Sequence, residues 1–318
     1  MNKQRVGSLY EFRDVDRSTN PISYIDYLDR SNANQNMRTA KEHIASFLRP
    51  KNGHVLLDIG CGVGHDAKVL ASFVGKTGLV VGIDKSKVMI QEAKRRFRRT
   101  ALPIEFYPCD AHKLDFPANK FNGSVCFSVL THCEQPAAVI SEAHRVLRPR
   151  GRLVAFEPDW DSLVISTGEQ SSDELLTSIL KKSVYHGGIA HQLPNLFTQC
   201  RFQFVTVQTI ALTISDYELA NKAWRIEPNI AHAQKTRLIS AADADHLRCG
   251  LRNLTQQFFG ALMVFAVTGT KGVHRSRTKA GAEGAIVQTI SRKPINQKRR
   301  THGTKKNFKE NYRSDPNR

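Results

Sequence analysis

The segment over residues 55–64, VLLDIGCGVG, constrains the fold of this chain more than any other. It is an apolar run of β-forming residues that carries one acidic residue, Asp58, and ends in three alternating glycines. Because glycine allows close backbone approach to a ligand, the pattern predicts a strand that ends in a binding turn. A second apolar run ends in Asp84, 24 residues after Gly60. This spacing is typical of a nucleotide-binding unit that places a carboxylate on a ribose.

Apolar runs and helical patterns alternate along the chain as far as residue 157. This alternation predicts a doubly wound α/β fold with a mostly parallel sheet. Two further apolar runs flank a helical stretch over 216–258 and bring the expected number of strands to seven. The expected strands cover 55–59, 79–83, 104–107, 123–128, 151–157, 202–210 and 261–267, and the other expected helices cover 36–48, 65–74, 86–98 and 136–147.

Several segments together resemble the class I S-adenosylmethionine (SAM) methyltransferases. They are the glycine turn, VVGIDKS at 80–86, CDAHKLDFP at 109–117, FNGSVCFSVLTHCEQP at 121–136 and EAHRVLRPRGRLVAFEPDW at 142–160. The resemblance covers residues 20–272 and implies a Rossmann-like sheet of seven strands, the last of them antiparallel. The segments FEPDWDSLVIST at 156–167 and HGGIAHQLPNLFTQCRF at 186–202 are similar to small-molecule methyltransferases related to the quinone-pathway C-methyltransferases.

A dinucleotide dehydrogenase is the main competing interpretation. The spacing G-x-G-x-G lacks the later glycine of the pyrophosphate-binding form, which argues against it. One departure from the methyltransferase pattern is Asn122, since aspartate is common before the fourth strand of that family. Asparagine forms similar turns and caps, so the local geometry is expected to survive.

The resemblance implies a role for each residue of the cofactor site. The glycine turn would lie along the methionine part of SAM, Asp84 would accept hydrogen bonds from the ribose hydroxyls, and Asp110 would accept from the adenine amino group. Ordinary capping of turns and strand ends is the alternative for these carboxylates. The expected cofactor-binding residues are Asp58, Gly60, Cys61, Gly62, Gly64, Asp84, Lys85, Asp110, Ala111, Phe127 and Ser128.

Methyl transfer from a sulfonium requires proximity, orientation and, where the nucleophile carries a proton, a base. The candidate bases follow two strands: His132 after the fourth and Glu157 after the fifth. A pKa near neutrality would suit His132 for taking a proton from a phenol, an enol or a carboxylic acid. A purely structural role at a helix start is the alternative for His132.

Six residues are expected to contact the acceptor: Tyr24, Tyr27, Asp159, Trp160, His186 and His191. Packing within an amphipathic cover segment is the alternative for the two tyrosines, and packing or exposure to solvent is the alternative for the two histidines. No metal site is expected, because the sequence has no H-x-E, H-E-x-x-H or clustered Cys/His pattern.

The net charge of +18 is unevenly distributed. Residues 271–318 hold 14 Lys and Arg against three acidic residues and lack apolar periodicity near the end, which predicts a disordered basic tail. Such a tail can bind nucleic acid or anionic lipid through phosphate contacts, or it can be a solvated appendage without a partner. The expected domains are an N-terminal cover segment and helix (1–50), a SAM-dependent methyltransferase domain (51–272) and the tail (273–318).

The six cysteines form no C-x-x-C pair, and no stretch approaches the ~20 apolar residues of a membrane span. A reducing, cytoplasmic location is therefore expected, and the oligomeric state stays open. The expected function is SAM-dependent methyl transfer to an O or C atom of a small organic acceptor. The alternatives are RNA methylation aided by the basic tail and SAM binding without catalysis.

Overall fold

A computed structural model describes residues 8–18, 20–33, 41, 46–254 and 258–273. The chain divides into two units, residues 1–274 and 275–318, and the second unit lies outside the described residues. The predicted tail over 273–318 therefore falls almost wholly outside them, as does most of the helix predicted over 36–48.

Seven strands form one sheet in the order β3-β2-β1-β4-β5-β7-β6. The first five strands in the chain pair in parallel, whereas β7 runs antiparallel to both β5 and β6. The prediction of a doubly wound sheet with an antiparallel last strand is confirmed. The strands are β1 (Val55–Ile59), β2 (Leu79–Asp84), β3 (Ile104–Pro108), β4 (Phe121–Phe127), β5 (Leu147–Ser166), β6 (Phe202–Ile214) and β7 (Phe259–Lys271).

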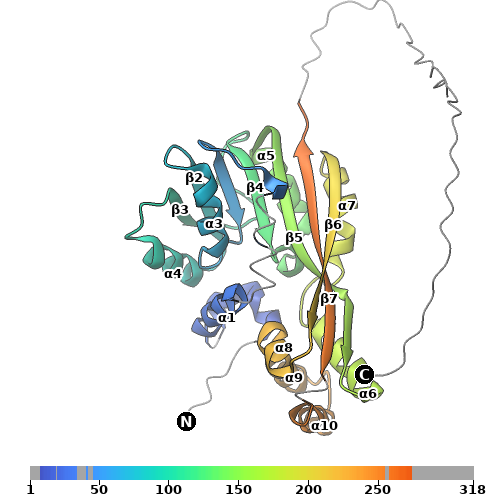
Figure 1. Ribbon diagram of the computed structural model, residues 1–318. Coiled ribbons are helices and arrows are strands. Elements are labelled where there is room, and N and C mark those ends of the chain that lie inside the picture. The colour runs from blue at the N-terminus through green and yellow to red at the C-terminus, as the bar shows by residue number, and fades with distance from the viewer. Residues whose placement is uncertain (1–7, 19, 34–40, 42–45, 255–257, 274–318) are drawn as a thin grey trace, which may run out of the picture. The chain divides into compact units, whose positions relative to one another are not determined.

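Helices cover both faces of the parallel half of the sheet (Figure 1). The first face packs against α3 (His65–Val74) and α4 (Lys87–Phe97), and the second against α5 (Pro136–Val146) and α7 (Ile189–Gln199). Because both faces are covered, the central strands are apolar runs without alternation, as expected for a buried parallel sheet.

The amino ends of two helices are fixed by local chemistry. Pro136 opens α5, where its missing N–H costs nothing. At α4, the Ser86 hydroxyl accepts a hydrogen bond from the Met89 N–H and donates one to Asp16. The Asp16 carboxylate also accepts from the Lys87 N–H, so a residue far away in sequence completes the hydrogen bonds at the amino end of α4.

Strands β5, β6 and β7 are longer than the sequence predicted and continue past the carboxyl ends of β1 and β4 (Figure 1). We call this extension and its helices the cap. It contains α6 (Gln170–Lys182), α8 (Tyr217–Trp224), α9 (Ile226–Lys235) and α10 (Ala241–Arg252), which share a hydrophobic core separate from that of the parallel half.

The described residues of the helical stretch predicted over 216–258 form three helices, α8, α9 and α10, with breaks that the prediction did not mark. The first break is Arg225, whose φ of +52° is left-handed and ends α8. The second is the turn before Ser240, which begins α10 with a capping box to Asp243.

Among the described residues before β1 are the 3₁₀ helix η1 (Leu9–Arg17), here called the strap, α1 (Ile22–Ala33) and helical residues at 41 and 46–48. The strap packs on the cap through Leu9 and Phe12. Asp29 of α1 contacts His65 of α3 and Arg96 of α4, which ties α1 to the parallel half of the sheet. No helix in the described part of the chain has the length and apolar character needed to cross a membrane.

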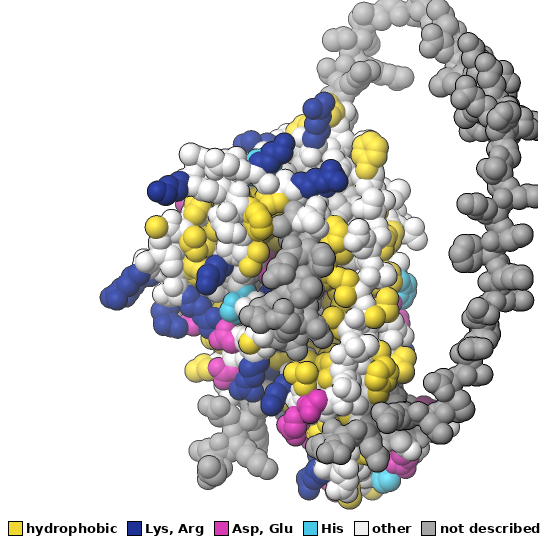
Figure 2. Space-filling model, in the orientation of Figure 1, with side chains coloured by type: hydrophobic (Ala, Val, Ile, Leu, Met, Phe, Trp, Pro, Cys, Tyr) yellow, Lys and Arg dark blue, Asp and Glu magenta, His cyan; other side chains and the backbone are white. Residues whose placement is uncertain are grey.

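Strand β6 forms one edge of the sheet and is exposed along most of its length. Its sequence, FQFVTVQTIALTI, carries no charge. Phe204 is 81% exposed and Val207 41%, and hydrophobic side chains are visible over this side of the molecule in Figure 2.

Gly260 lies where β7 passes the cap, and a Cβ there would approach the Trp224 ring to 2.4 Å. We expect Gly260→Ala to lower the free energy of unfolding by about 1–3 kcal/mol through overpacking. Gly250→Ala is the control, because Gly250 is helical with open space around it; it should be neutral or stabilise by up to about 1 kcal/mol. Urea denaturation measures both, and equal effects would contradict the packing described here.

Candidate active site

A cavity of about 520 Å³ opens at the carboxyl ends of β1, β2 and β4 and extends beneath the strap toward the cap. One half is lined by the glycine turn and the ends of the parallel strands, and the other by apolar and aromatic side chains. Ligands of doubly wound folds bind at this edge of the sheet. Of the sequence-predicted residues, those that line the cavity are Gly60, Cys61, Gly62, Asp84, Lys85, Asp110, Ala111, Phe127, Ser128, His132, Tyr27 and Trp160.

The glycine turn brings bare backbone to the cavity wall. Gly60 has a φ of +70°, and a Cβ there would lie 2.4 Å from the Val129 side chain. The Cys61 N–H donates to the Ile83 carbonyl at 2.8 Å, which holds the turn against β2. The Val129 and Leu28 side chains approach Gly60 and Gly62 so closely that neither residue could carry a side chain without displacing them.

Asp84 ends β2 beside this turn. One carboxylate oxygen accepts from the Gly62 N–H at 3.0 Å and the other from the Ser86 N–H at 2.9 Å. Burial raises the pKa of Asp84, and these two amides oppose that shift. Each oxygen keeps a lone pair, so the ionised carboxylate can accept two further hydrogen bonds from adjacent ligand hydroxyls.

Asp110 lies at the next strand end with a half-exposed side chain. It accepts from the His112 N–H at 3.0 Å and lies 2.7 Å from the His112 Nδ1. Partial burial raises the pKa of Asp110, but the contacts with His112 outweigh it and hold this pKa below its ordinary value. Asp110 is therefore an ionised acceptor at neutral pH.

Asp58 and Gly64 lie behind the turn and do not line the cavity. Asp58 is buried, accepts a hydrogen bond from the Ala67 N–H, and has a pKa well above its ordinary value, first because of burial and then because of Asp66. A Cβ on Gly64 would approach the Phe106 ring to 2.7 Å. Both residues were expected to bind the cofactor, but the structure places them behind the turn, where they pack against the protein.

Lys41 is a cavity residue that the sequence analysis missed. Its buried ammonium lies 2.9 Å from an Asp66 oxygen and 3.2 Å from the Asn32 side-chain oxygen, and 5.1 Å from the centre of the Phe127 ring. No sequence motif marks this lysine, because only the fold brings it to the glycine turn. A buried ammonium here can pair with a ligand carboxylate.

His132 lines the cavity at the turn after β4, next to Phe12 of the strap. Burial, together with the charge of Arg13, lowers the pKa of His132 to about 4. The expectation of a pKa near neutrality is therefore wrong. The ring is neutral at pH 7 and can accept a proton, but its conjugate acid is strong, so it favours proton transfer only from an acidic partner.

Glu157, the second candidate base, does not line the cavity. Its carboxylate is fully buried and accepts from the backbone N–H groups of Val129, Leu130 and Thr131 at 2.8, 2.8 and 3.3 Å. Burial raises the pKa of Glu157 to about 7 against the effect of these amides. Through these three hydrogen bonds Glu157 holds the turn that carries His132. Its own side chain does not line the cavity.

The apolar half of the cavity lies between the strap, α1 and the cap. Tyr27 and Trp160, both predicted acceptor contacts, line it, and the Tyr27 hydroxyl donates to the Ala223 carbonyl at 3.0 Å. Tyr24 does not line it, because its ring is buried and its hydroxyl contacts Glu11. The remaining apolar lining includes Leu9, Phe12, Leu212, Ile214, Trp224, Leu262 and Val264, most of which no motif could identify.

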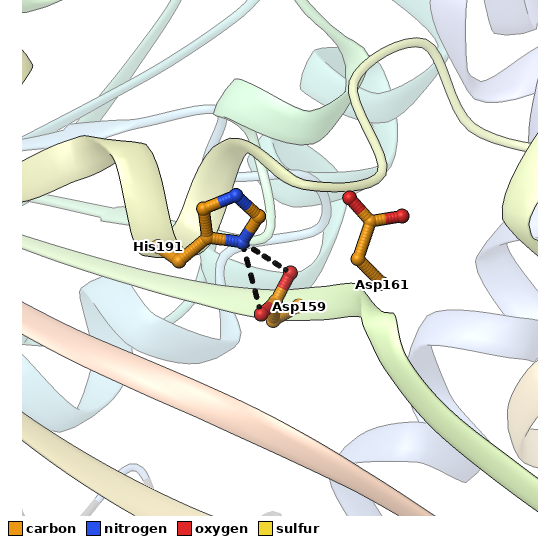
Figure 3. Close-up of side chains that lie close together, drawn as sticks. All are labelled: Asp159, Asp161 and His191. Carbon is orange, nitrogen blue, oxygen red and sulfur yellow. Dashed lines mark hydrogen bonds and ion pairs between the residues drawn. The ribbon is translucent and has the colours of Figure 1, made fainter.

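Asp159, His186 and His191 were also predicted to contact the acceptor, yet none of them lines the cavity. The His191 Nδ1 lies 3.1 Å from both carboxylate oxygens of Asp159, and Asp161 faces the same pair (Figure 3). The ligand atoms of these three residues lie within 4.8 Å of one another. Acidic groups commonly approach this closely without an ion, and the hydrogen bonds make Asp159 and His191 an acid–imidazole pair. Strand alternation explains the placement, since Pro158 and Trp160 face the cavity and Asp159 faces away.

The model of the methyltransferase domain family matches residues 57–155. An uncharacterised 37.1 kDa protein in transposon Tn4556 of Streptomyces fradiae is 33% identical over 252 residues, which cover 77% of this chain and 70% of that protein. The ubiquinone/menaquinone biosynthesis C-methyltransferase UbiE of Coxiella burnetii is 32% identical over 122 residues, which cover 38% of this chain and 49% of that protein. The chain belongs to the SAM-dependent methyltransferases.

The fold of this methyltransferase agrees with that of solved relatives. Phosphoethanolamine N-methyltransferase 2 of Haemonchus contortus, solved with S-adenosylhomocysteine (SAH), superposes with a TM-score of 0.54 at 20% identity, covering 82% of this chain and 60% of that one. The methyl donor of the family is SAM. The bare glycine turn, the paired acceptors of Asp84 and the buried Lys41 fit the amino-acid and ribose parts of that molecule.

Asp84→Asn tests the ribose contact. The amide has one oxygen where the carboxylate has two, so we expect the affinity for both SAM and SAH to fall at least about tenfold, in line with the loss of a charged hydrogen bond. Asp115→Asn is the control, since Asp115 is exposed and lies outside the cavity. Calorimetric titration measures both, and unchanged affinity in the Asp84 variant would exclude the assignment.

The raised pKa of Glu157 predicts a pH dependence of stability. Between about pH 4.5 and 7 the folded state keeps a proton that the unfolded state releases, so the ionised group destabilises the fold as pH rises. Relative to Glu157→Gln, the wild type should lose about 3 kcal/mol of unfolding free energy across this window and remain level above it. Denaturant unfolding at pH 5 and pH 8 measures the difference, and a constant difference would contradict the raised pKa.

Proposed function

We propose that this methyltransferase moves the methyl group of SAM to an oxygen or carbon atom of a small, largely apolar acceptor, and that residues 51–272 form its catalytic domain. The observation that carries the proposal is the continuity of one cavity from the glycine turn to the apolar half under the cap. A donor on the turn and an acceptor in the apolar half would share one water-poor space, which is what an in-line methyl transfer needs.

The residues of the donor half would contact three parts of SAM: the methionine part, the ribose and the adenine. In the donor half, Gly60, Cys61 and Gly62 would lie along the methionine part with Lys41 at its carboxylate. Asp84 would hold the ribose, and Lys85, Asp110 and Ala111 would face the adenine side. Phe127 and Ser128 would close the methionine side. Bound SAM supplies the electrophilic methyl group, and the protein supplies orientation and exclusion of water.

The acceptor half supports an apolar molecule with one acidic group. Aromatic side chains of Phe12, Tyr27, Trp160 and Trp224 surround this half, and His132 is the candidate base beside it. Because the pKa of His132 is about 4, the imidazole would take a proton efficiently only from a strongly acidic hydroxyl or a carboxylic acid. The name of the Coxiella relative, a quinone-pathway C-methyltransferase, supports an acceptor of this kind.

RNA methylation remains the second candidate because of the basic tail. It predicts that RNA affinity falls steeply with salt and is lost in a chain that ends at residue 273, whereas small-molecule transfer should be unaffected by this truncation. A cytoplasmic location fits the free thiols of all six cysteines and stays a prediction.

Transfer of a labelled methyl group to a panel of apolar carboxylic acids, phenols and enols tests the proposal. We expect turnover on at least one acidic acceptor, and His132→Gln should lower kcat by about 10²-fold with little change in KM. Both tryptophans line the cavity, so their fluorescence reports acceptor binding in wild type and variant alike. Acceptor binding without turnover in the wild type would favour a non-catalytic role.

A further inference from the structure

Glu157 is a buried acid that belongs to neither the proposed donor contacts nor the proposed acceptor contacts. It is fully buried, and no basic side chain of the described residues forms an ion pair with it. A buried carboxylate without a cation is costly, and side chains with strongly perturbed ionisation concentrate at functional sites. Because the described side chains supply no such cation, a bound ligand is the remaining source of positive charge.

The Glu157 carboxylate does not line the cavity but accepts hydrogen bonds from the 129–131 turn, of which Val129 and Thr131 do line it. Its Oε1 accepts from the N–H groups of Val129 and Leu130. Val129 in turn lines the cavity, and its side chain closes against Gly60 at the point where the glycine turn and the end of β4 meet. A positive ligand group between these two walls would therefore interact with Glu157 through a region with little water, where charges are weakly screened.

The titratable groups around Glu157 do not supply that charge. Cys126 of β4 and Cys133 after the turn both face it; burial first, and then Glu157, raise the pKa of each thiol, to about 12 for Cys133, so both are neutral. Farther along the same face of β5, Asp159 is already paired with His191. Phe265 of β7, which pairs with Glu157, brings no charge.

We propose that Glu157 is the buried counter-charge for the sulfonium of the donor, and that it loses its proton when the sulfonium binds. The proposal rests on the proposed donor site. It assigns Glu157 as a positioning residue, which acts through the 129–131 turn rather than by touching the donor. SAM and SAH differ by one methyl group and the positive charge it creates, so they probe this charge directly.

The linkage between proton binding by Glu157 and binding of the donor sets the direction of the pH dependence. A group that titrates near pH 7 in the free protein is partly protonated there, and a nearby positive charge favours its ionised form. Binding of SAM at pH 7 should therefore release up to about half a proton more than binding of SAH. The ratio of SAM to SAH affinity should rise by about tenfold from pH 5.5 to pH 8.5.

Calorimetric titration of the full chain at pH 7 in phosphate and in imidazole buffer counts the protons released by each ligand, because the buffers differ in ionisation enthalpy. We expect the SAM-minus-SAH difference to vanish in Glu157→Gln, with SAH affinity changed no more than about threefold. The glutamine oxygen can still accept from Val129 and Leu130. Glu174→Gln, on an exposed carboxylate of α6, should behave as wild type.

The wild type alone decides the proposal even if the variant fails to fold. If SAM and SAH both bind and release equal numbers of protons, Glu157 does not sense the sulfonium and the proposal is overturned. A SAM-minus-SAH difference that persists in Glu157→Gln overturns it as well, because another carboxylate such as Asp84 then carries the effect. Failure of both ligands to bind a folded wild type would instead overturn the proposed donor site and, with it, this inference.

Discussion

The hydrogen bonds of one carboxylate, Asp84, connect the parts of this molecule that form the cavity. One oxygen accepts a hydrogen bond from the Gly62 N–H and the other from the Ser86 N–H. Asp84 thus joins the glycine turn to the start of α4. Ser86 then binds Asp16 of the strap. A single strand-end aspartate thus links the donor half of the cavity to the element that closes the acceptor half.

Buried acids dominate the electrostatics around the donor half. Asp58, Asp84 and Glu157 all receive backbone amides, and burial raises the pKa of each. Lys41, a buried cation, lines the cavity together with Asp84. Backbone N–H groups carry only partial charges, so they satisfy the hydrogen bonds of these acids without neutralising them. A positive ligand group close to these acids would lower their pKa values and favour their ionised forms.

The cap determines what the acceptor half can hold. The extended ends of β5, β6 and β7 carry α8 past the edge of the parallel sheet, which places Trp224 opposite the strap. This wall is almost wholly apolar, whereas the donor half is rich in hydrogen-bonding groups. One cavity therefore offers two chemically distinct compartments that meet at the turn after β4.

The sequence by itself determined the parallel half of the fold, and its motifs predicted most of the residues that we propose for the donor site. Each strand there is a short buried run that ends in a turn, so strand position, the glycine turn and the aspartates at the ends of β2 and β3 are all local signals. Asn122 accepts a hydrogen bond from the Val55 N–H at 2.9 Å, a contact between residues 67 apart in the chain that the local pattern did not predict.

Only the tertiary structure decided the rest, because the deciding interactions join residues distant in the chain. Lys41 reaches the glycine turn, and the cap surrounds the acceptor, through contacts that leave no periodic pattern. The ionisation of His132 and Glu157 depends on burial, which a local sequence does not encode. Alternation along β5 then separated Trp160, which faces the cavity, from Asp159, which does not, although the two are neighbours in the chain.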